Sequence, residues 1–229
     1  MILSDPEWQA VLLSLKVSGI AVIGSLPFGI LMAWILVRCR FPGKALLDSL
    51  IHLPLVLPPV VVGYLLLISL GRRGIIGEKL YDWFGFSFAF SWRGAALASA
   101  VIAFPLMVRA IRLALEAVDN RLEQAARTLG AGRWRVFFTI TLPLTLPGVI
   151  VGTVLAFARS LGEFGATITF VSNIPGETRT LPLAMFTLIE TPGAEGAAAR
   201  LCVIAIVLAL ASLLASEWLA RAGRKRMGN

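Results

Sequence analysis

The sequence predicts an all-α, polytopic membrane protein with about five transmembrane helices. Hydrophobic residues make up 58% of the 229 positions and charged residues only 15%, whereas a soluble domain carries about 25% charged residues. The apolar residues are concentrated in long runs, and a water-soluble core of this size could not bury them all. The composition therefore favours insertion into a lipid bilayer.

Five apolar runs are long enough to cross about 30 Å of hydrocarbon, which takes about 20 helical residues. The expected spans cover residues 11–37, 45–70, 94–115, 142–168 and 197–219. Proline interrupts two of them, with Pro54, Pro58 and Pro59 in the second span and Pro105 in the third. Because proline removes an internal hydrogen bond, we expect kinks there, which suit either a moving pathway or a static bundle.

Lysine and arginine are distributed unequally between the loops. Thirteen lie in segments 38–44, 109–141 and 220–229, and five lie in segments 1–10, 71–93 and 169–196. With five spans, the first three segments share one side of the membrane. The positive-inside rule then predicts an amino terminus on the outer side of the membrane and a carboxyl terminus in the cytoplasm. The basic residues behind the formal charge of +8 set the orientation in the membrane and face anionic lipid headgroups. No nucleic-acid partner is therefore expected.

The fourth span carries Gly148, Gly152, Ala156 and Ser160 at a spacing of four residues. This spacing places the small side chains on one helical face, where another backbone can approach closely. Packing within the bundle is the interpretation that we favour, and the alternative is a seam between two copies of the chain.

The basic loop between the third and fourth spans contains a short amphipathic helix. Asn120 is predicted to cap this helix, Glu123 falls where its side chain can reach back to the cap, and Gly130 supplies a stop. About three turns are too few to be stable alone, and small apolar residues at the centre are surrounded by arginines. Such a helix is suited to a groove of a partner protein. The alternative is an interfacial loop that rests in lipid headgroups.

The pattern Glu123-x-Ala125-Ala126-x-x-x-Gly130, followed after nine residues by Ile140-x-Leu142-Pro143, resembles the EAA signature of permeases of bacterial ATP-binding-cassette importers. The resemblance implies a single permease domain of the type I ABC importer fold over residues 1–229, with a coupling-helix loop at 119–139. In that family the helix docks into a cleft of a cytoplasmic ATPase. The coupling residues implied here are Glu123, Ala125, Ala126, Arg127, Gly130 and Arg133, with the two arginines as rim contacts.

Three further stretches narrow the substrate class. Arg40-Phe-Pro-Gly-Lys44, Leu53-Pro-Leu-Val-Leu-Pro-Pro-Val-Val-Val-Gly63 and Ala158-Arg-Ser-Leu-Gly-Glu-Phe-Gly-Ala-Thr167 resemble molybdate permeases of the ModB type, and sulfate and thiosulfate permeases share a looser form of the last stretch. The resemblance implies import of molybdate, or of tungstate, sulfate or thiosulfate, through the bacterial inner membrane. A periplasmic oxyanion-binding protein would deliver the substrate. One signature loop per chain and only five spans predict a homodimer with two ATPases.

Two charged residues, Arg159 and Glu163, stand four apart in the otherwise apolar fourth span. Measured from Pro143, Arg159 lies about 24 Å along the helix axis, in the outer part of the membrane. Charges inside a membrane are costly and usually face the protein interior or water. Arg159, Ser160 and Glu163 are therefore candidate pathway residues that attract an anion. The alternative, which we favour, is an ion pair between Arg159 and Glu163 that stabilises the helix.

No catalytic residue, metal or cofactor is expected. His52, the single histidine, lies four residues after Asp48 and is predicted to form a polar pair with it. The chain lacks the His-Glu-x-x-His, Gly-x-Ser-x-Gly and Gly-x-x-x-x-Gly-Lys-Ser/Thr patterns, so a membrane enzyme is not favoured and ATP hydrolysis is expected in a separate subunit. A channel or proton-coupled carrier that works without an ATPase is the other alternative, although these usually show paired acids or charge rings at mid-membrane.

Overall fold

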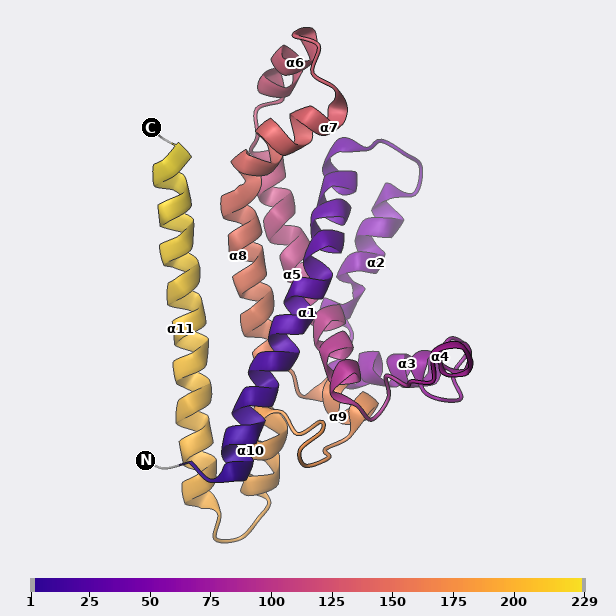
Figure 1. The fold of residues 1–229 in the computed structure, drawn as a ribbon, viewed down its shortest axis with the longest axis vertical. Helices are drawn as coiled ribbons and strands as arrows, with labels where there is room; N and C mark the ends of the chain where they lie inside the picture. The colour runs from indigo at the N-terminus through magenta and orange to yellow at the C-terminus, as the bar shows by residue number, and fades with distance from the viewer. Residues whose placement is uncertain (1–2, 228–229) are drawn as a thin grey trace.

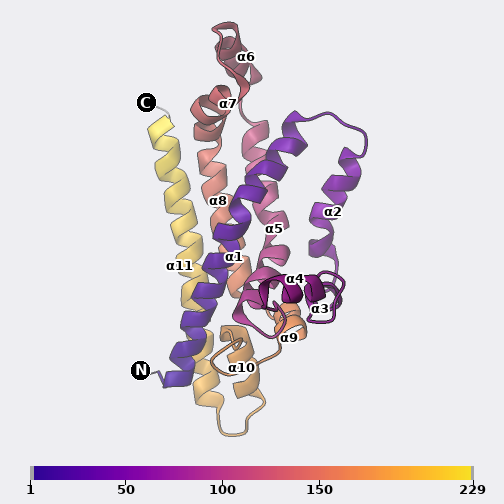
Figure 2. The same ribbon diagram turned by 45° about the vertical axis from the view of Figure 1, so that its right-hand side comes forward.

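The computed structural model describes residues 3–227, which form helices joined by turns and loops, with no strand in this range. Four long helices run side by side along the long axis of the molecule (Figures 1 and 2). These are α1 (Asp5–Arg38), α5 (Trp92–Glu116), α8 (Leu142–Leu161) and α11 (Glu195–Met227). The shorter elements are α2 (Lys44–Val56), α3 (Pro59–Leu70), α4 (Gly77–Phe84), α6 (Asn120–Thr128), α7 (Arg133–Val136), the π-helical turn η1 (Phe137–Thr141), α9 (Gly165–Val171) and α10 (Leu181–Ile189).

The two ends of the bundle carry different parts of the chain. The start of α1 lies at one end, whereas the end of α11 and the projecting α6 lie at the other (Figures 1 and 2). The loop from α1 to α2 also lies at the α6 end, as expected for segments 38–44 and 109–141 on one side of a membrane. Residues 1–2, and residues 228–229 of the basic tail, fall outside the described residues.

The apolar helices agree with the predicted number of spans. Four are long and apolar enough to cross a bilayer: Asp5–Arg38, Trp92–Glu116, Arg133–Leu161 and Glu195–Ala215. A fifth crossing is added when α2 and α3 are counted as one broken span. The exterior is also apolar, since Val56 on α2 is 83% exposed and Leu214 on α11 is 70% exposed. An apolar outer surface of this extent fits lipid rather than water.

The second span is broken near its prolines, as predicted, and α3 is bent by 113° relative to α2. Leu57 at the break has extended backbone angles, with φ −69° and ψ 141°. A residue that precedes proline is disfavoured in the helical region, and Pro58 follows Leu57 directly. The new helix then begins at Pro59, in the first turn, where proline is tolerated. By contrast, α5 continues through Pro105 without interruption.

The fourth span also ends earlier than predicted. Helix α8 stops at Leu161, and α9 begins at Gly165 after a short turn. Arg159 therefore lies in the last turn of α8, whereas Glu163 lies in the turn that follows. The prediction that both belong to one uninterrupted helix was wrong, and the break lies at the pair of charged residues.

The strip of small residues on α8 packs within the bundle, as favoured from the sequence. A Cβ atom placed on Gly148 would lie 2.1 Å from the Cβ of Ala114, and one on Gly152 would lie 3.0 Å from the carbonyl oxygen of Met107. Both contacted residues belong to α5. The two long helices therefore approach closely because this face of α8 has no bulky side chain.

Two ion pairs join neighbouring helices of the bundle. Glu7 of α1 accepts a hydrogen bond from Arg200 of α11 at 2.8 Å. Asp48 of α2 accepts one from Arg112 of α5, also at 2.8 Å. Because an unpaired charge is costly away from water, these pairs fix which helices are neighbours.

We predict that Gly148→Ala destabilises the protein by about 1–3 kcal/mol, because the added methyl group cannot fit against Ala114 without separating α5 from α8. The measurement is the thermal unfolding midpoint of the purified protein in detergent. Gly19→Ala in α1 is the matched control, since no atom lies within 4 Å of its added Cβ. Equal midpoints for Gly148→Ala and the unaltered protein would contradict the close packing.

Candidate functional site

The amphipathic helix predicted in the basic loop is α6, and its ends are defined by local hydrogen bonds. Asp119, rather than the predicted Asn120, is the cap residue, and its carboxylate accepts a hydrogen bond from the Arg121 backbone N–H at 2.9 Å. Gly130 follows the helix with a φ of +84°, in the left-handed region that favours glycine. The Gly130 and Ala131 N–H groups donate to carbonyl oxygens of the last turn, each at 3.0 Å. This arrangement confirms Gly130 as the helix stop.

Glu123 does not reach back to the cap, as the sequence had suggested. Its side chain points into the protein and is only 10% exposed. One carboxylate oxygen accepts hydrogen bonds from the Arg38 guanidinium at 2.7 Å and from the Thr141 hydroxyl at 2.8 Å. Arg38 ends α1, and Thr141 immediately precedes α8. One buried carboxylate therefore ties α6 to two membrane-spanning helices.

Arg38 and Thr141 were not identified as site residues from the sequence. Arg38 was visible only as a basic residue after the first apolar run, and Thr141 only as an unspecified position within the Ile140-x-Leu142-Pro143 pattern. Arg38 also donates to the side-chain oxygen of Asn120, so it holds two residues of the first turn of α6. The residue predicted as the cap is thus a part of the same tether.

The apolar face of α6 points away from the bundle. Leu129 is 88% exposed, Leu122 is 49% exposed, and Ala125 is also exposed. Arg127 and Arg133, the predicted rim residues, are exposed beside this face. Burying an apolar helix face stabilises it, whereas this face is uncovered within the described part of the chain. Of the predicted coupling residues, Glu123 is thus directed inward and Ala126 is half-buried, whereas the others are exposed.

The candidate pathway residues form a compact polar cluster at the end of α8. Arg159 donates to Glu163 at 2.8 Å, with 31% of the Arg159 side chain and 1% of the Glu163 side chain exposed. The second carboxylate oxygen of Glu163 accepts from the Ala166 backbone N–H at 2.8 Å, in the first turn of α9. Ser160 is buried, and its hydroxyl has no hydrogen-bond partner among the described residues. Glu163 therefore joins α8 to α9 while it holds the partly exposed guanidinium.

His52 forms the predicted polar pair with Asp48. Its Nδ1 lies 2.9 Å from the Asp48 carbonyl oxygen and 3.2 Å from a carboxylate oxygen of the same residue. Within residues 3–227, no group of three or more histidine, cysteine, aspartate or glutamate side chains is arranged to hold a metal ion.

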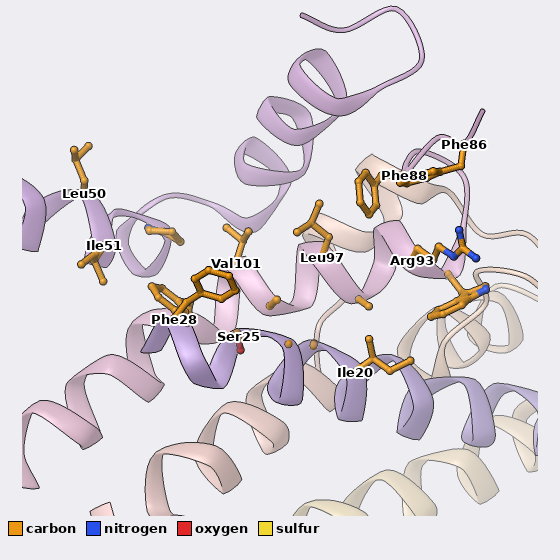
Figure 3. Close-up of a pocket in the computed structure, with 17 residues that line it drawn as sticks. Ile20, Ser25, Phe28, Leu50, Ile51, Phe86, Phe88, Arg93, Leu97 and Val101 are labelled. Carbon is orange, nitrogen blue, oxygen red and sulfur yellow. The ribbon is translucent and has the colours of Figure 1, made fainter. Parts of the chain in front are cut away.

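A hollow of about 830 Å³ between α1, α2 and α5 is lined almost entirely by apolar side chains. Figure 3 shows Arg93 near one end and Leu50 and Ile51 near the other. Recognition of an oxyanion needs several convergent hydrogen-bond donors. This hollow offers one guanidinium at its edge, so it is not an oxyanion site.

Comparison with known proteins agrees with this architecture. The family model described as "Binding-protein-dependent transport system inner membrane component" matches residues 25–227. The chain is 82% identical to the molybdenum transport system permease protein ModB of Escherichia coli (strain K12) over the full length of both chains. It is 65% identical to the protein of the same name from Haemophilus influenzae, covering 97% of each.

A solved structure has the same fold at low sequence identity. A bacterial ABC transporter involved in the import of the acidic polysaccharide alginate superposes with a TM-score of 0.71 at 19% identity, covering 97% of this chain and 80% of that one. The fold is therefore that of an ABC importer permease. The chain belongs to the family of binding-protein-dependent transport system inner membrane components.

Proposed function

We propose that this chain is the permease subunit of an ATP-binding-cassette importer that moves molybdate, or a related oxyanion, from periplasm to cytoplasm by alternating access. The observation that carries the proposal is α6, a helix with an uncovered apolar face that is tied through Glu123 to α1 and α8. The names of the two full-length relatives support molybdate as the substrate. Tungstate, sulfate and thiosulfate are the alternatives within the same class.

The proposed machine needs a separate ATPase, since the sequence contains no phosphate-binding loop of its own. Each chain offers one α6 and therefore one docking site. Four or five crossings are too few to enclose a gated path, so we propose a homodimer that binds two ATPases. A periplasmic oxyanion-binding protein delivers substrate at the end of the bundle where α1 begins, and the α6 end and the carboxyl terminus face the cytoplasm.

Coupling follows from the way in which α6 is held. ATP binding closes the two ATPases and draws the two α6 helices together, and hydrolysis resets them. Because Glu123 is bonded to Arg38 and Thr141, displacement of α6 passes into α1 and α8. Ala125 and Ala126 allow the ATPase cleft to approach the helix closely, Gly130 ends it, and Arg127 and Arg133 contact the rim. The coupling loop is thus residues 119–139 of one permease domain.

For the pathway, we propose that Arg159 attracts the dianion near its outer mouth. Support comes from its position at the outer end of α8, its partial exposure and its alignment by the buried Glu163. Ser160, whose hydroxyl is unpaired among the described residues, is the neighbouring donor. A single guanidinium gives weak discrimination between oxyanions, so selectivity lies mainly in the binding protein.

Reconstitution tests the proposed function directly. Vesicles that contain this chain, the ATPase and the binding protein should take up labelled molybdate when ATP is supplied on the α6 side. Vesicles without the ATPase should not, and uptake by the chain alone would favour the carrier alternative. Isothermal titration of the binding protein with molybdate, tungstate and sulfate identifies the preferred oxyanion.

We predict that Gly130→Glu lowers ATP-driven uptake at least tenfold while ATP hydrolysis persists, because a side chain at this left-handed position distorts the end of α6. Uptake and hydrolysis are measured on the same reconstituted vesicles. Gly193→Glu is the matched control, because Gly193 has the same φ of +84° and also no atom within 4 Å of an added Cβ, but follows α10 at the opposite end of the bundle. Intact coupling in Gly130→Glu would contradict the docking assignment.

We predict that Arg159→Ala lowers uptake more than it lowers assembly with the ATPase, because the guanidinium attracts the substrate. Its removal also leaves Glu163 buried and unpaired, which alone costs about 3–5 kcal/mol. The double variant Arg159→Ala/Glu163→Gln removes that charge. It therefore distinguishes a role of Arg159 in the substrate pathway from a role in stabilising the helix. Assembly is measured by copurification and uptake with labelled molybdate. Normal uptake by the assembled double variant would assign the pair a purely structural role.

A further inference from the structure

Two hollows of different character adjoin each other between α1 and the α7–η1 segment, close to α6. The first has a volume of about 490 Å³ and is lined by apolar residues of α1, from Pro27 to Trp34, and by Phe138 and Leu142 on the opposite side. The second has a volume of about 500 Å³ and lies against α6. Both volumes are typical of hollows that bind small ligands.

The hollow against α6 is strongly basic. Its lining contains four arginines, Arg38, Arg40, Arg127 and Arg133, and one acidic residue, Glu123. Arg38 is already paired with Glu123. Within the described part of the chain, none of the other three arginines takes part in an ion pair. The hollow therefore presents three uncompensated guanidinium groups, which favour an anion.

The two hollows share a wall, so that one ligand can occupy both. Trp34, Arg133 and Phe137 line each of them. The rings of Trp34 and Phe137 meet edge to face, with centroids 6.4 Å apart. Trp134 lines the apolar hollow and is 75% exposed, as is typical of aromatic side chains at a membrane interface. A ligand that fits this pair of hollows has an apolar chain and an anionic head.

We propose that an anionic phospholipid of the inner leaflet binds here, with its acyl chain against α1 and its phosphate between Arg133 and Arg40. The apolar hollow borders the part of α1 that crosses the membrane, and the basic hollow lies at the end where α1 leaves it. Basic pockets between membrane helices on the cytoplasmic side are suited to anionic headgroups. The lipid joins α1 to α7 beside the Glu123 tether and stabilises the position of α6.

The inference rests on the proposed function only for the assignment of the α6 end to the cytoplasm. It is tested on the complex of this chain with its ATPase, extracted into detergent with bound lipid and analysed by native mass spectrometry. The probes are phosphatidylglycerol and phosphatidylethanolamine, added in equal amounts. The unaltered complex should retain phosphatidylglycerol in preference.

Replacing Arg133 by glutamine should reduce phosphatidylglycerol retention about fivefold, the effect expected for one cationic contact near a membrane surface. Arg135→Gln is the matched control, since Arg135 lies on the same helix, is exposed, and lines neither hollow. Leu31→Trp should obstruct the acyl chain, because Leu31 lines the apolar hollow and is 47% exposed. A free phosphate ion has no acyl chain, so a loss in this variant identifies a lipid as the ligand.

The inference is overturned if Arg133→Gln and Leu31→Trp retain as much phosphatidylglycerol as Arg135→Gln. It is also overturned if Arg133→Gln loses the ATPase subunit while lipid retention is unchanged, since Arg133 would then serve ATPase docking alone. Failure of the unaltered chain to copurify with any ATPase would contradict the proposed function. Lipid retention would still be measurable on the chain itself, so the two failures are distinguishable.

Discussion

The buried carboxylate of Glu123 is the interaction on which the proposed coupling depends. A helix of nine residues is not stable by itself in water, and α6 projects beyond the bundle with its apolar face uncovered. The bonds from Glu123 to Arg38 and Thr141 hold it in a defined position relative to α1 and α8. Because a buried carboxylate is costly without its partners, the three groups move as one unit. A force applied to α6 is therefore delivered to two spanning helices.

The opposite half of the molecule contains two broken spans beside the starts of the unbroken α1 and α11 (Figure 1). The bend at Leu57–Pro58 and the turn after Leu161 produce α3 and α9, which pack so closely that a Cβ on Gly63 would lie 2.6 Å from the Ala166 carbonyl oxygen. Arg159 and Glu163 lie at this second break. Under the proposed function, the long helices tied to α6 transmit force, and the short, interrupted helices lie where a pathway can open.

Local features of the sequence were sufficient for the number of spans, the shared end of the basic loops and the extent of α6. Hydropathy, basic loop residues and Gly130 determine these over short stretches of chain. The 113° bend was not predicted, because the prolines indicate a break but not its angle. The partners of Glu123 were missed for another reason: Arg38 is 85 residues away in the chain, and no periodic pattern relates the two. In the folded protein, tertiary packing places the Glu123 carboxylate against Arg38 and Thr141 and away from the start of α6.

The most direct test of the account is a crosslink from α6. Ala126→Cys, modified with a bifunctional maleimide in the assembled complex, should join this chain to a separate ATPase subunit, because Ala126 lies at the centre of the proposed docking face. Gly193→Cys, at the opposite end of the bundle, should give no such product. Absence of an ATPase crosslink from Ala126, or labelling of Ala126 from the periplasmic side of intact cells, would contradict the central claim.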